Sequence, residues 1–175
     1  SVHLVERDRI GSGASGGLLG ALMPHMPDRW NAKKQFQYEA LVSLEAEIAQ
    51  LEAETGLSAG YRRCGRIMPL AKPHLRDIAL RHEHEALANW NQQGRSFFWN
   101  VVERPEIPGW PADEFTASGI VFDTLAARVS PRSLLSVLKE WLGRQQNVIV
   151  DEGCDAVDID LQNGRASLSD GRTVS

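Results

Sequence analysis

The first twenty residues constrain the fold of this chain more than any other stretch, because they join an apolar strand to a glycine-rich loop. Val2, Leu4 and Val5 form a short run of the kind found in β-strands, and Glu6 ends that run. The loop that follows lets the backbone approach a ligand closely, since it has glycines at positions 11, 13, 16, 17 and 20. A strand that ends in an acid beside such a loop is typical of nucleotide-binding folds, where the carboxylate accepts hydrogen bonds from a ribose.

Residues 11–16 match the dinucleotide fingerprint GxGxxG letter for letter, but they stand in the wrong order relative to the acid. In that fingerprint the glycines come first and the acid follows about 20 residues later. Here Glu6 precedes Gly11. We therefore interpret the match as a coincidence and Glu6 as the acid that ends the second strand of the fold. Since only five residues precede Glu6, the first strand and its phosphate loop are expected to lie outside this chain.

With Glu6 in that position, the chain resembles the D-amino-acid oxidase superfamily of FAD-dependent oxidoreductases, especially its glycine oxidase-like and tRNA-modifying branches. In those proteins a loop of the type Ala-Ser-Gly-x-x-x-Gly follows the acid some eight residues on, as Ala14–Gly20 does here. The segments Cys64–Leu70 and Val129–Arg132 resemble a later hairpin and a helix start of the same family. The resemblance runs along the whole chain and covers about the first half of a family member.

This resemblance implies FAD as the cofactor and gives positions in the chain their roles. Glu6 would bind the adenosine ribose with Arg7 beside it, and Asp155 would lie near the adenine through its backbone. The remaining cofactor contacts would come from Ala14, Ser15, Leu19, Gly20 and Ala21. Family members oxidise a carbon–nitrogen bond by passing a hydride to the flavin, which supplies the chemistry. The resemblance therefore requires no acid–base pair, and the sequence identifies no catalytic residue.

The same resemblance implies a mixed α/β fold in two portions. Residues 1–60 and 131–175 are assigned to a Rossmann-like FAD-binding portion. Residues 61–130 are assigned to a substrate portion built on antiparallel strands and a helix. We expect the segments from Val2 and from Val148 to lie in a different sheet from residues 97–102.

Apolar periodicity and boundary residues predict three helices, which run from Asn31 to about Thr55, from Pro73 to Gly94 and from Ser130 to about Gln146. The first helix is expected to bury one apolar stripe made of Phe36, Ala40, Leu44, Ile48 and Leu51. Hairpins are predicted over residues 61–71, around Gly65, and over residues 156–168, around an Asn-Gly turn. Single strands are predicted at 97–103, 119–122 and 148–150.

Charge and cysteine content narrow the possible partners and compartment. The net charge of -4 and the pI near 5.7 give no general argument for binding nucleic acid or an anionic membrane. Arg62, Arg63 and Arg66 form a small basic patch, which we interpret as a solvated edge. The two cysteines, Cys64 and Cys154, lie far apart and favour a reducing cytoplasm. No apolar run approaches the ~20 residues that span a bilayer.

Two further groups of residues are given structural interpretations. His82 and His84 stand two apart on a predicted helix and therefore point about 200° away from each other, so they cannot share a metal and no metal site is predicted. His25 is interpreted as a surface residue of a proline-bounded loop. The aromatic residues between positions 97 and 110 are expected to serve a core or a sheet face rather than a substrate cavity.

Three functional hypotheses follow. The first is an FAD-dependent oxidoreductase acting on a small amine or amino acid, as in glycine oxidase. The second is an FAD-dependent oxidoreductase that modifies the wobble uridine of tRNA, because the Gly20–Pro24 continuation resembles that branch. The third is an inactive fragment without bound flavin. Nucleic acid would be a partner only in the second hypothesis.

Overall fold

The computed structural model describes residues 1–92 and 94–175, which divide into two compact units. Unit 1 comprises Ser1–Gly20, Ile48–Gly60 and Ser130–Ser175, and unit 2 comprises Ala21–Glu47 and Tyr61–Val129. The predicted mixed α/β class is confirmed by the three helices and several small sheets among these residues. The sequence analysis assigned residues 1–60 to one portion, but residues 21–47 belong to unit 2 and not to unit 1. The assignment of portions to cofactor and substrate stays a prediction.

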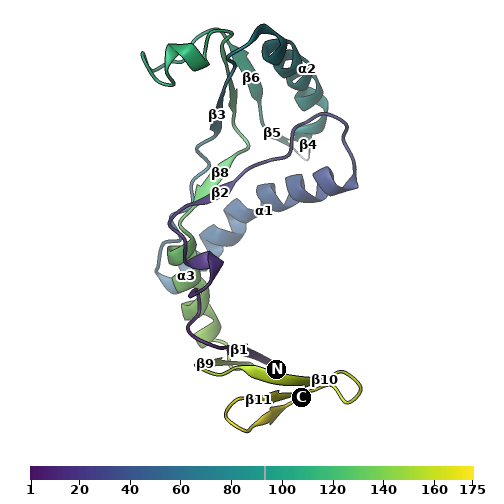
Figure 1. Cartoon of the computed structure of the whole chain (residues 1–175), viewed down its shortest axis with the longest axis vertical. Coiled ribbons are helices and arrows are strands. Elements are labelled where there is room, and N and C mark those ends of the chain that lie inside the picture. Colours follow the sequence, from purple (N-terminus) through teal and green to yellow (C-terminus); the bar gives the residue numbers. More distant parts are fainter. Residues whose placement is uncertain (93) are drawn as a thin grey trace. The chain divides into compact units, whose positions relative to one another are not determined.

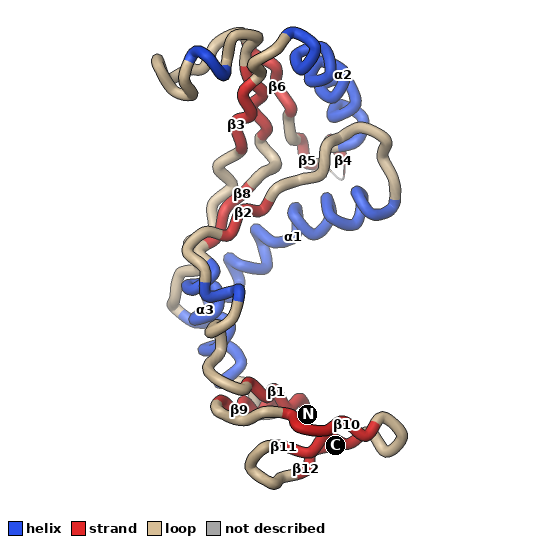
Figure 2. Tube along the Cα trace, viewed as in Figure 1, coloured by secondary structure: helices blue, strands red, loops and turns tan. Residues whose placement is uncertain are grey.

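A parallel pair of strands forms the first sheet of unit 1. Strand β1 (Val2–Glu6) pairs with β9 (Val148–Glu152), in a register that runs from Val2 opposite Val148 to Glu6 opposite Glu152. Figures 1 and 2 show the two strands side by side. Helix α3 (Pro131–Gly143) precedes β9 and begins at a cap, because the Ser130 hydroxyl accepts a hydrogen bond from the Ser133 amide.

The second sheet of unit 1 is antiparallel and contains three strands in the order β10, β11 and β12. Strand β10 (Ala156–Asp160) turns through Asn163–Gly164 into β11 (Arg165–Leu168), and β12 (Thr173–Val174) completes the sheet. The Asp160 carboxylate accepts hydrogen bonds from the backbone amides of residues 162 and 163. The predicted Asn-Gly hairpin is therefore confirmed.

Unit 2 is built on an antiparallel sheet whose strand order is β3, β7 and β6. These strands are β3 (Arg66–Pro69), β7 (Ile120–Asp123) and β6 (Trp99–Val102). Helix α2 (Pro73–Asn89) lies beside them in Figure 1. Among the described residues, two short strand pairs complete the strands: β2 (Gly20–Leu22) pairs with β8 (Ala127–Val129), and β4 (Asn91–Gln92) pairs with β5 (Arg95–Ser96). The described chain also has two single-turn helices, η1 (Ala14–Gly16) and η2 (Asp113–Phe115). The β1–β9 and β3–β7–β6 sheets are separate, as predicted.

Alternation along the strands gives the β3–β7–β6 sheet two distinct faces. One face forms the core, in which Trp99 and Val121 pack with Trp90. The rings of Trp90 and Trp99 meet edge to face, with centroids 5.9 Å apart. The core also receives Tyr38 and Leu41 from α1 (Ala32–Thr55). The opposite face carries Ile67, Asn100, Val102, Ile120 and Phe122.

Two arginines of the predicted solvated edge are instead integrated into the fold. The Arg66 guanidinium pairs with the fully buried Asp123 carboxylate through an Nε–Oδ2 distance of 2.6 Å. Arg63 donates to the backbone carbonyls of Leu125 and Leu41, and its side chain is only 12% exposed. The solvated-edge interpretation is wrong for both residues, because each guanidinium has partners inside unit 2.

The strand pairing of residues 61–71 also differs from the prediction. The two halves do not pair with each other: Arg62 forms an antiparallel bridge with Arg128, and β3 pairs with β7. Gly65, with a φ of 73°, lies between them, and a side chain there would collide with Phe122 and the Asp123 backbone. This glycine thus permits close packing against β7 and does not form a hairpin turn.

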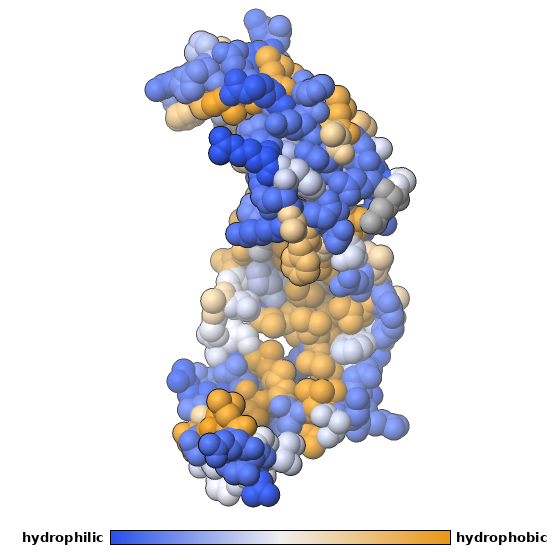
Figure 3. Space-filling view, turned by 90° about the vertical axis from the view of Figure 1, so that its right-hand side faces the viewer, coloured by the Kyte–Doolittle hydropathy of each residue, from blue (hydrophilic) through white to orange (hydrophobic). Residues whose placement is uncertain are grey.

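The predicted apolar stripe of α1 is partly wrong. The helix begins after Asn31, whose side chain caps the amides of Lys33 and Lys34, and it ends at Thr55 as expected. Ile48 is buried and Leu44 and Leu51 are half-buried, as predicted. Phe36, however, is 75% exposed and Ala40 is exposed, whereas Tyr38 and Leu41, outside the predicted stripe, are buried. Large apolar side chains remain exposed in both units and give orange surface in Figure 3. In the described part of the chain, no helix is long and apolar enough to cross a membrane.

Candidate functional site: a nucleotide-type loop in unit 1

The candidate site lies at the end of β1, where the segment that follows β9 is hydrogen-bonded to the segment that follows β1. The Cys154 amide donates to the Glu6 carbonyl over 3.1 Å, and the Gly153 amide donates to the Asp8 carbonyl over 2.8 Å. These bonds place Asp155, one residue further on, near the end of β1. Two residues that lie far apart in the sequence, Glu6 and Asp155, are thereby brought into one region of unit 1.

The Glu6 carboxylate is partly free to bind a ligand. Its Oε1 atom accepts a hydrogen bond from the Asp8 amide at 3.0 Å. Among the described residues, no hydrogen bond occupies the other oxygen, Oε2. A carboxylate with one oxygen held by the backbone and one available is oriented to accept hydrogen bonds from hydroxyl groups.

Helix α3 and β9 hold the glycine-rich loop at three points. Glu152 accepts from the Ile10 amide at 2.8 Å and pairs with Lys139 of α3 at 2.5 Å. The Arg132 Nε donates to the Gly16 carbonyl at 2.5 Å. Gly11 lies so close to α3 that an added Cβ would be 2.6 Å from Leu135 Cδ1. The loop conformation thus depends on residues near the other end of the chain.

Three of the predicted cofactor residues line the same hollow. Glu6, Ala14 and Ser15 face a space of about 450 Å³ whose floor includes Leu135 and Leu138 of α3. These leucines are half-buried because they line the hollow, and only Val137 of α3 is fully buried. A neighbouring hollow of about 420 Å³ is bordered by polar residues of the same helix and by the loop glycines; these polar residues are Arg132, Ser136 and Lys139.

The other predicted residues have different surroundings. Arg7 is exposed and forms a loose ion pair with Asp8, with 4.0 Å between Nε and Oδ2. Leu19 is 73% exposed. Gly20 and Ala21 lie in β2, and Ala21 belongs to unit 2. Asp155 exchanges two hydrogen bonds with Ser169, so its amide is already engaged while its carbonyl keeps a second lone pair. The roles of all these residues stay predictions.

Sequence reasoning missed Arg132, Lys139 and Glu152. Arg132, Ser136 and Lys139 are spaced i, i+4 and i+7 and therefore share one helix face. That polar face on an otherwise leucine-rich helix was the available signal, but the sequence does not show that it faces the glycine loop. No group of three or more potential metal ligands occurs among the described residues. His82 is half-buried against Trp99 and His84 is exposed, so the two side chains have different surroundings.

Two carboxylates of β9, Asp151 and Glu152, have lowered pKa values. Hydrogen bonds from Lys139 and from the Ile10 amide lower the pKa of Glu152 below its ordinary value of 4.5. Hydrogen bonds from His3 and Arg172 likewise lower the pKa of Asp151. A carboxyl group whose pKa is lower in the folded state stabilises the fold above its unfolded-state pKa. That stabilisation is lost as the pH falls through the folded-state pKa.

We therefore expect Glu152→Gln to reduce the acid sensitivity of unit 1. Between about pH 5 and about pH 3, the melting temperature of the variant should fall less steeply than that of the wild type, because the amide does not titrate. Thermal unfolding across this pH range measures the effect. Glu140→Gln removes an exposed carboxylate of α3 that pairs with Arg144, the residue that caps the end of this helix, and it serves as the control. An unchanged slope in Glu152→Gln would contradict the assignment.

The residues present fit the adenosine end of FAD. A ribose would need a hydrogen-bond acceptor, and the Oε2 atom of Glu6 is available for this role. The hollow beside it has an apolar floor and is bordered by the glycine loop. Over residues 1–174, the chain matches the family model described as FAD dependent oxidoreductase, DAO. The chain belongs to this family. Family membership implies FAD binding, in agreement with the resemblance stated from the sequence.

Three solved structures have a similar fold. Glycine oxidase from Geobacillus kaustophilus matches with a TM-score of 0.74 and 18% identity, over 99% of this chain and 46% of that one. L-amino acid deaminase from Proteus myxofaciens matches with a TM-score of 0.74 and 15% identity, over 98% of this chain and 37% of that one. Iminodiacetate oxidase from Chelativorans sp. BNC1 gives a TM-score of 0.64 and 14% identity, over 99% and 46%.

The chain thus spans less than half the length of these neighbours. The search of curated proteins found no match. At these identities the likeness shows the fold alone.

Proposed function

We propose that the protein oxidises a carbon–nitrogen bond of a small amine or amino acid, with FAD as the hydride acceptor. The observation that carries the proposal is the hollow in unit 1, where Glu6, Ala14 and Ser15 lie together in a chain of the DAO family. The structural neighbours support the substrate class, since they are named for glycine, L-amino acids and iminodiacetate, and each of these compounds contains an amine nitrogen.

In this proposal the residues of unit 1 bind and orient the cofactor, and the flavin supplies the hydride chemistry. Glu6 accepts hydrogen bonds from the ribose through Oε2. Arg132 and Glu152 keep the glycine loop in place by their bonds to Gly16 and Ile10. They are positioning residues, because their bonds are to the backbone of the loop.

We expect Glu6→Ala to weaken FAD binding by about 1.5 to 3 kcal/mol, because ribose hydroxyls lose a charged acceptor. Flavin titration of the full-length protein, followed by absorbance or fluorescence, gives the dissociation constant. Asp8→Ala is the matched control, since it removes the same charge two residues away while keeping the backbone amide that orients Glu6. A dissociation constant that is unchanged in Glu6→Ala, or equally weakened in both variants, would refute the ribose assignment.

Simple measurements distinguish this proposal from the two other hypotheses, the tRNA-modifying enzyme and the inactive fragment. A purified protein without flavin absorbance near ~450 nm would favour the inactive fragment. Release of peroxide from glycine, sarcosine or D-alanine would favour the amine oxidase over the tRNA-modifying enzyme. Two arginines that could have formed a basic patch for tRNA, Arg63 and Arg66, are engaged within unit 2. The cytoplasmic location inferred from the two cysteines is part of the same proposal, and both cysteines are free.

A further inference from the structure

The second face of the β3–β7–β6 sheet carries a pocket lined by residues of unit 2 alone. Its floor is formed by cross-strand neighbours, with Ile67 and Asn100 both opposite Phe122, and Val102 opposite Ile120. The segment after β6 borders the floor and contributes Ile107 and Trp110 to the lining. The pocket has a volume of about 240 Å³, below the roughly 300–1,000 Å³ of drug-sized sites. It suits a small ligand, such as a single ring with one substituent.

The walls of this pocket are apolar and remain accessible. Ile107 is 59% exposed and Trp110 is 56% exposed, although both are large apolar side chains. Exposed apolar residues that gather around a concavity mark a binding site more often than residues scattered singly. The ligand should therefore have an apolar body that covers these side chains and Phe122.

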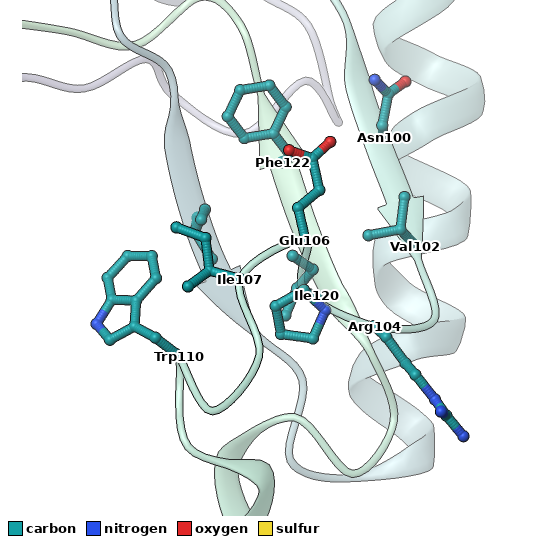
Figure 4. Close-up of a pocket in the computed structure, with 10 residues that line it drawn as sticks. Asn100, Val102, Arg104, Glu106, Ile107, Trp110, Ile120 and Phe122 are labelled. Atoms are coloured by element: carbon teal, nitrogen blue, oxygen red, sulfur yellow. The ribbon is translucent and has the colours of Figure 1, made fainter.

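One charged side chain is directed into the pocket. Figure 4 shows the Glu106 carboxylate near Phe122, whereas the Arg104 guanidinium points away from the apolar side chains. In the described chain, Glu106 takes part in no hydrogen bond or ion pair. A carboxylate beside aromatic rings provides both an ion-pair partner and a ring face for a cation. The polar end of the ligand should therefore be an ammonium group.

We propose that this pocket binds a small amine with an apolar body, with Glu106 pairing with the ammonium group and Phe122 and Trp110 contacting the body. The inference extends the proposed function, on which it rests for the amine class, by naming an apolar body as the feature recognised. The binding itself involves unit 2 alone and does not require FAD.

The test uses benzylamine as the probe and isoleucine methyl NMR as the readout. Three of the eight isoleucines, Ile67, Ile107 and Ile120, line the pocket, whereas Ile48 and Ile78 serve as internal controls. We expect saturable shifts at the three lining methyls at pH 7. Benzyl alcohol, the neutral compound of similar shape, should bind at least fivefold more weakly. Glu106→Gln should weaken benzylamine binding at least fivefold, and Glu103→Gln, a nearby exposed carboxylate outside the lining set, should change it less than twofold.

Each alternative gives a different result. Equal affinity for benzylamine and benzyl alcohol, or no effect of Glu106→Gln, would overturn the recognition of charge. Shifts at the lining methyls that depend on protein concentration without ligand would indicate that a second copy of the chain covers this face, and would also overturn the proposal. The Glu6→Ala variant distinguishes a failure of this pocket proposal from a failure of the proposed flavin function. It should leave the shifts at the lining methyls unchanged even if it abolishes flavin binding.

Discussion

Replacing Asp123 with alanine is expected to lower the free energy of unfolding by about 3 to 5 kcal/mol. The carboxylate is fully buried, pairs with Arg66 at 2.6 Å and accepts from the Ala126 amide at 2.9 Å. Its removal leaves the Arg66 guanidinium, which is only 14% exposed, without its charged partner beside Trp99. Urea denaturation followed by tryptophan fluorescence measures the loss.

The control for this prediction is Glu45→Gln. Glu45 also pairs with arginines, Arg63 and Arg95, but its side chain is 49% exposed. Exposed ion pairs contribute about 0–1 kcal/mol because water screens them. If Asp123→Ala lowers the free energy of unfolding no more than Glu45→Gln does, the buried pair does not stabilise unit 2 in the way described.

Replacing Gly16 with alanine is expected to cost about 3 kcal/mol and to weaken FAD binding tenfold or more. A Cβ at position 16 would lie well inside contact distance of the Gly11 carbonyl oxygen. That oxygen belongs to the backbone and cannot move aside as a flexible side chain can. The loop must therefore open, which also disturbs the bond from Arg132 to the Gly16 carbonyl.

Gly13→Ala is the matched control in the same loop. A Cβ added at position 13 would meet no atom within 4 Å. This substitution should therefore leave the stability of the fold and the affinity for FAD nearly unchanged. Thermal unfolding and flavin titration of the two variants are the measurements. Equal effects at positions 13 and 16 would mean that general loop stiffness, and not the contact with Gly11, is responsible.

The sequence predicted those elements whose signals are local. Ser130-Pro131 starts α3, Asn31 caps α1, and Asn163-Gly164 turns β10 into β11. In each case the residue that determines the structure lies beside the structure it determines. The acid at the end of β1 could be found for the same reason, since Glu6 follows its strand directly.

Features that depend on distant partners could not be predicted in this way. The sequence around Gly65 has the composition of a hairpin, and only the position of β7 shows that each half pairs elsewhere. The two arginines of the supposed solvated edge likewise have partners far along the chain, such as Asp123 for Arg66. In the candidate site, Arg132 and Glu152 meet the loop across 116 and 142 residues, and periodicity carries no information on such pairs.

The pairing of β1 with β9 has a consequence for the order of folding during synthesis. Within this chain β1 is synthesised long before its partner strand, since Val2 pairs with Val148. Contacts between residues so distant in sequence form slowly, because a long segment must be ordered before they are made. The strands and helix of unit 2 are complete before β9 appears. The nascent glycine loop, which is bonded to Glu152 of β9, should therefore become protected from proteases later than unit 2.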